Sequence, residues 1–152
     1  MNDEEAMRIA LAEARSAPAH GDVPIGAVVL VGGDVVARRH NEREALKDPT
    51  AHAEILALRD AARDSGDWRL SEATLVSTIE PCPMCAGAAV AARVARVVFG
   101  APDPKAGACG SLYNLCADPR LNHEARVTPS VLAGQCGEEV ARYFAERRSP
   151  LA

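Results

Sequence analysis

The chain has 152 residues, of which 48% are hydrophobic and 25% are charged. This length and composition predict one globular domain, residues 1–152, and exclude a disordered chain. The net charge of −4 excludes a general nucleic-acid-binding protein, which is usually basic, but it leaves room for a local basic patch.

Hydrophobic periodicity predicts helices and strands that alternate along the chain. Apolar side chains recur with helical spacing in four segments, residues 3–17, 50–63, 84–92 and 138–148. Short apolar or β-branched runs predict five strands, residues 25–31, 35–37, 74–77, 94–99 and 126–128. Thr50 is the expected N-cap of the second helix.

This order of elements favours a central sheet that helices cover on both faces, an α/β fold. Residues 101–124 are rich in Pro, Gly, Asn and Asp, so we expect an irregular or functional loop there. We find no repeat, low-complexity tract or linker in the sequence.

The sequence also favours the reducing cytoplasm and no membrane partner. No apolar run approaches the roughly 20 residues that a membrane-spanning helix needs. The first five residues are acidic and lead into an amphipathic pattern, which is unlike a secretory signal. Five cysteines is an odd number, and without a secretory signal a disulfide framework is not expected.

Two short motifs point to a metal. Cys82 and Cys85 have the C-x-x-C spacing, and Pro83 between them marks a helix start, where both sulfurs can reach one ion as thiolates. A tetrahedral zinc ion then lacks two ligands; a catalytic site needs only one more protein ligand and an open position. His52, at the start of the preceding expected helix, is the candidate third ligand.

The spacing of His52 and Glu54 separates their roles. Two residues along a helix correspond to about 200° of rotation, so the two side chains would point apart deep inside a helix. At a helix start both can approach one ion from different sides. Because two thiolates and one imidazole already neutralise Zn²⁺, we interpret Glu54 as the base that takes a proton from activated water, not as a ligand.

Each fragment alone has a simpler explanation. A lone C-x-x-C pair can be a thioredoxin-like redox centre, a lone His at a helix start is usually a polar surface residue, and a lone Glu is usually a solvated charge. The combination of H-x-E with P-C-x-x-C matches the signature of zinc-dependent nucleobase deaminases.

Nearly the whole chain resembles the bacterial tRNA adenosine deaminases, members of the cytidine deaminase-like superfamily of zinc deaminases. The segments that carry the resemblance are Asp22–Val28, Asn41, Asp48–Glu54, Glu80–Ala88, Val97–Ala101, Asp103, Lys105, Gly107, Gly110–Leu112, Asn122–His123, Tyr143–Phe144 and Arg147–Arg148. One departure is Pro83, at a position where the family pattern has Val or Thr.

The resemblance implies a three-layer α/β/α sandwich around a five-stranded mixed sheet. It also implies a homodimer with one zinc ion per subunit, which deaminates adenosine to inosine at the wobble position of a tRNA anticodon. The chain would then bind the anticodon stem-loop of tRNA as its partner.

The resemblance assigns roles residue by residue. It implies zinc ligation by His52, Cys82 and Cys85, proton transfer by Glu54, and contact with the flipped base by Asn41. It implies a pocket lined by Val23 and Pro24. The residues expected near the anticodon loop are Asp103, Lys105, Phe144, Arg147 and Arg148.

Alternatives remain open at this point. The same motifs occur in deaminases of free bases or nucleosides, of guanine or cytosine type, and a zinc-stapled RNA-binding module without catalysis is a further possibility. Arg147 and Arg148 have an alternative as a solvated helix end. Cys109, Cys116 and Cys136 are expected to pack as small hydrophobic residues, and His20 and His40 to lie in loops or on the surface.

Overall fold

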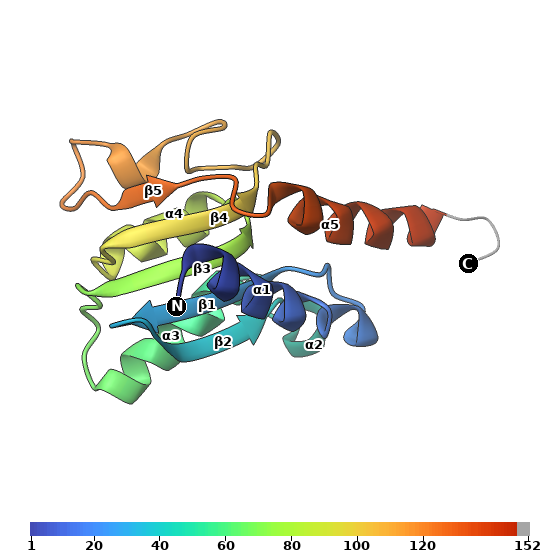
Figure 1. Cartoon of the computed structure of the whole chain (residues 1–152), viewed down its shortest axis with the longest axis horizontal. Coiled ribbons are helices and arrows are strands. Elements are labelled where there is room, and N and C mark those ends of the chain that lie inside the picture. The colour runs from blue at the N-terminus through green and yellow to red at the C-terminus, as the bar shows by residue number, and fades with distance from the viewer. Residues whose placement is uncertain (149–152) are drawn as a thin grey trace.

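The computed structural model describes residues 1–148 and has five strands in one mixed sheet, with helices on both faces (Figure 1). The helices are α1 (Asp3–Ala14), α2 (Arg43–Leu46), α3 (Ala53–Ser65), α4 (Pro83–Ala91) and α5 (Ala133–Arg148), with short 3-10 turns η1 (Ala17–His20) and η2 (Leu115–Ala117). The strands are β1 (Gly26–Val31), β2 (Asp34–His40), β3 (Ala73–Ile79), β4 (Arg96–Ala101) and β5 (Arg126–Thr128).

The strands lie in the order β2-β1-β3-β4-β5. β1 pairs antiparallel with both β2 and β3, whereas β3, β4 and β5 run parallel. A parallel pair needs a crossover, and α4 provides it between β3 and β4. The ends of β2, β3 and β4 and the start of β1 therefore meet at one edge of the sheet.

The helices form two layers. α1 and α5 pack on one face of the sheet, and α3 and α4 pack on the other. Side chains alternate between the two cores because successive strand residues point to opposite faces: in β1, Val29 joins the α3–α4 core and Val28 joins the α1–α5 core. The expected three-layer α/β/α fold is confirmed.

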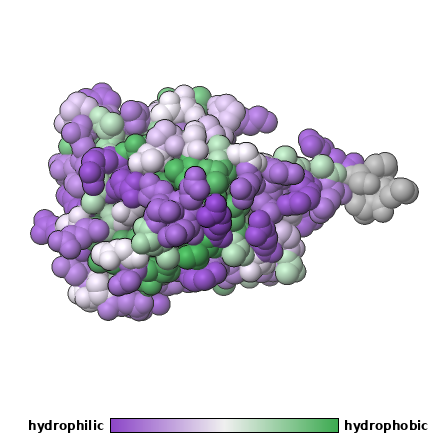
Figure 2. Space-filling view, in the orientation of Figure 1, coloured by the Kyte–Doolittle hydropathy of each residue, from purple (hydrophilic) through white to green (hydrophobic). Residues whose placement is uncertain are grey.

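The face that carries α1 is largely hydrophilic, and its larger hydrophobic patches lie near the centre of the view, beside that helix (Figure 2). A capping box fixes the start of α1: Asn2 accepts from the backbone N–H of Glu5, whose carboxylate accepts from the N–H of Asn2. Within residues 1–148, no helix combines the length and the apolar character that crossing a membrane requires.

The sequence located every main helix and strand, but not all of their ends. The helix expected over residues 3–17 stops at Ala14, and Pro18 belongs to the following 3-10 turn. The strand expected over residues 35–37 extends through His40. The prediction missed α2, which is a single turn too short for a periodic signal.

Candidate active site

Two helix starts bring the candidate ligands together at the sheet edge. His52 is the N-cap residue of α3, and Cys82 is the N-cap residue of α4. The prediction of Thr50 as N-cap was wrong: its amide and hydroxyl bond to Asp48, two residues before it. The extended backbone of His52, with φ −72° and ψ 152°, lets its ring turn away from the helix axis toward the cysteines.

The three side chains converge closely enough to hold one ion. Nδ1 of His52 lies 3.7 Å from the sulfur of Cys82 and 3.5 Å from the sulfur of Cys85. Zinc–sulfur bonds of about 2.3 Å and zinc–nitrogen bonds of about 2.0 Å at tetrahedral angles give separations close to these values. All three ligand atoms lie within 4.8 Å of one another, which fits the donor set of a zinc site.

The charges of this group also call for a cation. Hydrogen bonding from the Cys85 thiol lowers the pKa of Cys82 to about 4, so the pair holds one thiolate at neutral pH. The neighbouring Cys82 sulfur and burial raise the pKa of Cys85, because a second negative charge beside the first is unfavourable. A divalent cation removes that conflict and lets both sulfurs bind as thiolates.

Glu54 lies in the first turn of α3, beside the ligand group. Its side chain is only 4% exposed, and burial raises the pKa of its carboxyl above the ordinary value. The carboxyl contacts the Cys85 thiol and is not one of the three converging ligands. This position, near a metal but outside its ligand set, suits a proton-transfer group.

His52, Cys82 and Glu54 line one cavity, which measures about 630 Å³ when the open space at its mouth is included. The apolar part of the wall includes Val23 and Ile25, which both precede β1, and Ile79 at the end of β3. The cavity therefore lies at the sheet edge where three strands end.

Asn41 lines the cavity with spare hydrogen-bonding capacity. Its Nδ2 donates to the carbonyl of Val23 at 3.3 Å, and its Oδ1 accepts from the N–H of Arg43 at 3.2 Å. An amide has two N–H groups and two acceptor lone pairs, so one of each remains for a ligand. Val23 lies on the cavity wall as expected, whereas Pro24 is fully buried and does not line it.

An apolar groove continues from the cavity toward α5. The two share Val23, Ile25, Ile79 and Asp103, and the groove adds Lys105 and Phe144. Phe144 is 43% exposed, which is high for a large hydrophobic side chain. The groove therefore combines an aromatic face with one cation.

Arg147 lies apart from this groove. Its guanidinium sits 4.2 Å from the ring centroid of Tyr143, against a hollow that also contains Pro18 and Glu146. Arg148 is exposed in the same last turn of α5. The structure thus brings Asp103, Lys105 and Phe144 to the mouth of the cavity but not Arg147.

Glu80 is a buried residue of the site that the sequence reasoning missed. It precedes the C-x-x-C motif, lines the cavity, and is 3% exposed. Its carboxylate accepts the backbone N–H groups of Asp103, Cys109 and Ser111, each at 3.0 Å, and the Ser111 hydroxyl. A Cβ at Gly107 would overlap this carboxylate. Glu80 therefore fixes the loop that carries Asp103 and Lys105.

We expect Glu80→Ala to lower the free energy of unfolding by about 3 kcal/mol or more, because each buried N–H without an acceptor costs about 1–3 kcal/mol. Urea denaturation of the purified variant measures this. Glu72→Ala, at an exposed position, is the control and should stay within about 0.5 kcal/mol of the parent. Equal stability of the two variants would contradict the anchoring role.

The other polar residues of interest lie away from the cavity. Cys109, Cys116 and Cys136 are buried as expected, although the sulfurs of the first two approach to 3.9 Å. The expectation that His20 and His40 are ordinary loop or surface residues was wrong: their rings stack, half-buried, with centroids 5.2 Å apart. His40 is the last residue of β2.

Comparison with known proteins agrees with this geometry. Residues 1–101 match the family model described as the cytidine and deoxycytidylate deaminase zinc-binding region. The chain is 49% identical over 146 residues to a tRNA-specific adenosine deaminase of Bacillus subtilis, covering 96% of this chain and 91% of that protein. It is 44% identical over 147 residues to one of Haemophilus influenzae, covering 96% and 85%.

Solved structures show the same likeness. A structure from work on A-to-I editing by tRNA:A34 deaminases at the wobble position has a TM-score of 0.86 and 42% identity, covering 89% of this chain and 98% of that one. A guanine deaminase from Nitrosomonas europaea has a TM-score of 0.81 at 25% identity, covering 93% and 84%. The chain therefore belongs to the cytidine and deoxycytidylate deaminase family of zinc-binding proteins and, within it, to the tRNA-specific adenosine deaminases.

Proposed function

We propose that this protein catalyses the zinc-dependent hydrolysis of adenosine to inosine at the wobble position of a tRNA anticodon. The observation that carries the proposal is a His/Cys/Cys ligand group beside a buried carboxyl, at a cavity that His52, Cys82 and Glu54 line. The 49% identity to a tRNA-specific adenosine deaminase supports the choice of substrate. We further propose that residues 1–152 form a single deaminase domain.

In this proposal His52, Cys82 and Cys85 hold one zinc ion, which supplies, when bound, the Lewis acid that makes water nucleophilic near neutral pH. Glu54 takes a proton from the water that adds to C6 of adenine and delivers it to the ring nitrogen. Glu54 then passes the second proton to the departing amine, so that ammonia leaves and the oxygen stays on C6. The raised pKa of the buried Glu54 suits a group that must both accept and donate.

The adenine base can enter the cavity only after it has left the stack of neighbouring bases. Unstacking costs less free energy in an anticodon loop than in a duplex, because the bases of the loop are not all paired. The free N–H and lone pair of Asn41 face a purine edge in this arrangement, and Val23 packs against the ring. Pro24 supports Val23 from the buried side and makes no proposed contact with substrate.

We propose that the groove beside the cavity holds nucleotides that flank the adenosine. Phe144 offers an exposed ring on which a base can stack, and Lys105 offers a cation for phosphate. Asp103 shapes the rim, since its Oδ1 accepts the N–H groups of Lys105 and Ala106 at 3.0 and 3.2 Å. Arg147 and Arg148 would add positive charge further along α5.

Lys105→Ala is expected to weaken binding of an anticodon stem-loop and to reduce the salt dependence of log K by about one unit of slope. Filter binding at several salt concentrations measures both effects. Arg69→Ala removes an exposed cation just before β3, at the opposite edge of the sheet, and should change neither. An unchanged slope in Lys105→Ala would remove Lys105 from the phosphate contacts.

The experiment that tests the proposed function offers the protein an anticodon stem-loop with adenosine at the wobble position. Free guanine, cytosine and adenine are offered separately. We expect inosine in the stem-loop and no turnover of free bases. Turnover of free bases alone would assign the protein to the guanine- or cytosine-type deaminases, and binding of the stem-loop without inosine would indicate an RNA-binding module.

We also propose a homodimer that works in the cytoplasm. The family resemblance supports the dimer, and the exposed side chains of Leu112 and Tyr113, 54% and 57% accessible, offer apolar surface for a subunit contact. All five cysteines are free thiols, which suits a reducing compartment. Light scattering of the eluting protein gives the mass, and a monomer at micromolar concentration would contradict the dimer.

A further inference from the structure

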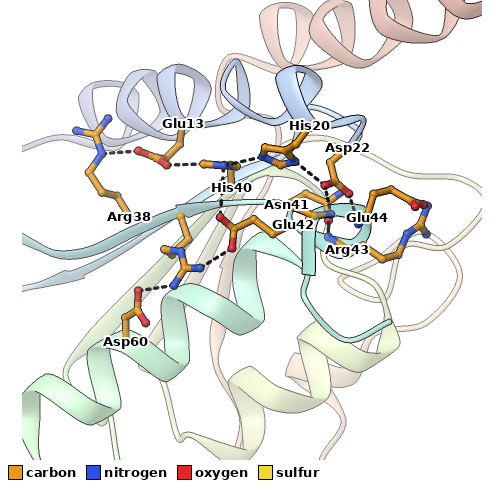
Figure 3. Close-up of polar contacts among 12 residues, drawn as sticks. Glu13, His20, Asp22, Arg38, His40, Asn41, Glu42, Arg43, Glu44 and Asp60 are labelled. Carbon is orange, nitrogen blue, oxygen red and sulfur yellow. Dashed lines mark hydrogen bonds and ion pairs between the residues drawn. The ribbon is translucent and has the colours of Figure 1, made fainter. Parts of the chain in front are cut away.

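A second group of metal-binding side chains lies outside the active site. His20 ends the 3-10 turn η1, His40 ends β2, and Glu42 follows two residues later (Figure 3). Nε2 of His20 lies 3.1 Å from Nε2 of His40, which lies 3.6 Å from Oε1 of Glu42. The three ligand atoms all lie within 4.8 Å of one another.

A carboxylate binds the Nδ1 side of each ring, and this fixes which nitrogen faces the other histidine. Nδ1 of His20 is 2.7 Å from Asp22, and Nδ1 of His40 is 2.8 Å from Glu13. Asp22 also accepts two backbone N–H groups, and Glu13 also accepts from the Arg38 guanidinium, so both act as carboxylate acceptors. Each Nδ1 therefore carries a hydrogen, and each Nε2 presents a lone pair to the other.

Two lone pairs 3.1 Å apart repel unless a cation lies between them. A shared proton or a metal ion can fill this role. Glu42 stabilises either cation by its negative charge, but a metal ion can also use its oxygen as a third protein ligand. Its Oε2 accepts from Arg39 at 2.6 Å, which orients the carboxylate and leaves Oε1 toward the histidines.

The distances fit a divalent metal ion of borderline softness, such as Zn²⁺. Zinc–nitrogen bonds of about 2.0–2.1 Å at a tetrahedral angle place two ligand atoms about 3.3 Å apart. The observed separations of 3.1 and 3.6 Å lie on either side of this value. A carboxylate bonded to the second nitrogen of each imidazole is the arrangement that orients metal-binding histidines and raises their basicity.

We propose that His20, His40 and Glu42 form a second site for a divalent cation such as Zn²⁺, with Asp22 and Glu13 orienting the two histidines. The rings are 29% and 18% exposed, so an ion can enter from solvent and complete its coordination with water.

The place of this site gives it a positioning role. His40 and Glu42 flank Asn41, and Asp22 precedes Val23, so an ion held there braces two residues of the cavity wall. Asp22 also accepts the N–H groups of Glu44 and Ala45 in α2 at 2.7 and 3.1 Å. The ion would thus tie η1, β2 and α2 together around the substrate pocket.

The test counts metal in the full-length protein equilibrated with excess Zn²⁺ and then freed of unbound ion. Native mass spectrometry should find two zinc ions per chain. His40→Gln and, independently, Glu42→Gln should each reduce the count to one, with the Cys82/Cys85 site still filled. His123→Gln, a half-buried histidine bonded to the carbonyl of Val94, is the matched control and should keep two.

Glu13→Gln provides a finer test because it removes no ligand. Loss of such a supporting carboxylate lowers metal affinity about 10–100-fold, so competition with a chelator should show this loss at the second site alone. One zinc ion per parent chain in excess Zn²⁺ would overturn the proposal and leave a shared proton between the rings. Two zinc ions in both His40→Gln and Glu42→Gln would overturn it equally.

Discussion

Glu54→Gln is expected to reduce inosine formation by about 10³-fold or more, because general acid–base catalysis contributes about 10²–10⁴-fold and one carboxyl here serves both proton transfers. Gln has the size of Glu but can neither take a proton from water nor return one to the amine. The rate is measured on an anticodon stem-loop under single-turnover conditions, so that product release does not enter.

The same variant should fold and hold zinc like the parent. Glu54 is not one of the three converging ligands, and an uncharged amide removes the cost of burying a carboxylate. Glu72→Gln is the matched control at an exposed position and should keep full activity. If Glu54→Gln deaminates at the parent rate with its zinc in place, proton transfer belongs to another group.

Cys85→Ala is expected to empty the active-site metal position and abolish activity. The residue is fully buried, and its sulfur lies 3.5 Å from His52, so no solvent-exposed side chain can replace it as ligand. The remaining imidazole and single thiolate bind zinc far more weakly than three ligands do. Zinc content and inosine formation of the purified variant measure both effects.

Cys136→Ala separates the loss of a ligand from the loss of a buried sulfur. Cys136 is equally buried, in α5 against the sheet, and lies outside the metal group. We expect this control to keep its zinc and its activity. Thermal unfolding adds a second readout: zinc should raise the Tm of Cys136→Ala and of the parent, because it binds only the folded state. A tightly bound active-site zinc in Cys85→Ala would refute the ligand assignment.

Local patterns predicted the elements well and their junctions poorly. Hydrophobic periodicity and residue composition located β5 at residues 126–128, and they located the crossover helix α4 to within one residue at each end. The N-cap of α3 was misplaced at Thr50, a good capping residue whose side chain instead bonds to Asp48. A histidine is a poor N-cap, and its position there follows from the metal group rather than from helix propensity.

The metal group was predictable because its spacing is chemically specific. Cys82 and Cys85 lie on one helix turn, and only a third donor was needed to complete a catalytic site. The sheet order was not predictable in this way. β1 and β2 form a local hairpin, but β1 also pairs with β3, whose residues are distant in sequence. The mixed sheet was expected from the resemblance alone.

Residues that act through long-range contacts escaped the sequence reasoning. Glu80 accepts hydrogen bonds from amides 23 to 31 residues away, and no pattern in the sequence around Glu80 indicates those partners. His20 and His40 are 20 residues apart and meet only because β2 returns along β1 to the turn that holds His20.

The central claim is that one zinc ion, held by His52, Cys82 and Cys85, enables this chain to deaminate wobble adenosine. The most direct test strips the protein of metal, adds zinc back in steps, and follows inosine formation in an anticodon stem-loop. Activity should rise linearly and saturate at one zinc ion per chain, because two thiolates bind zinc more tightly than the second group does. Inosine formation at the full rate in the stripped protein, or none in the restored protein, would contradict the account.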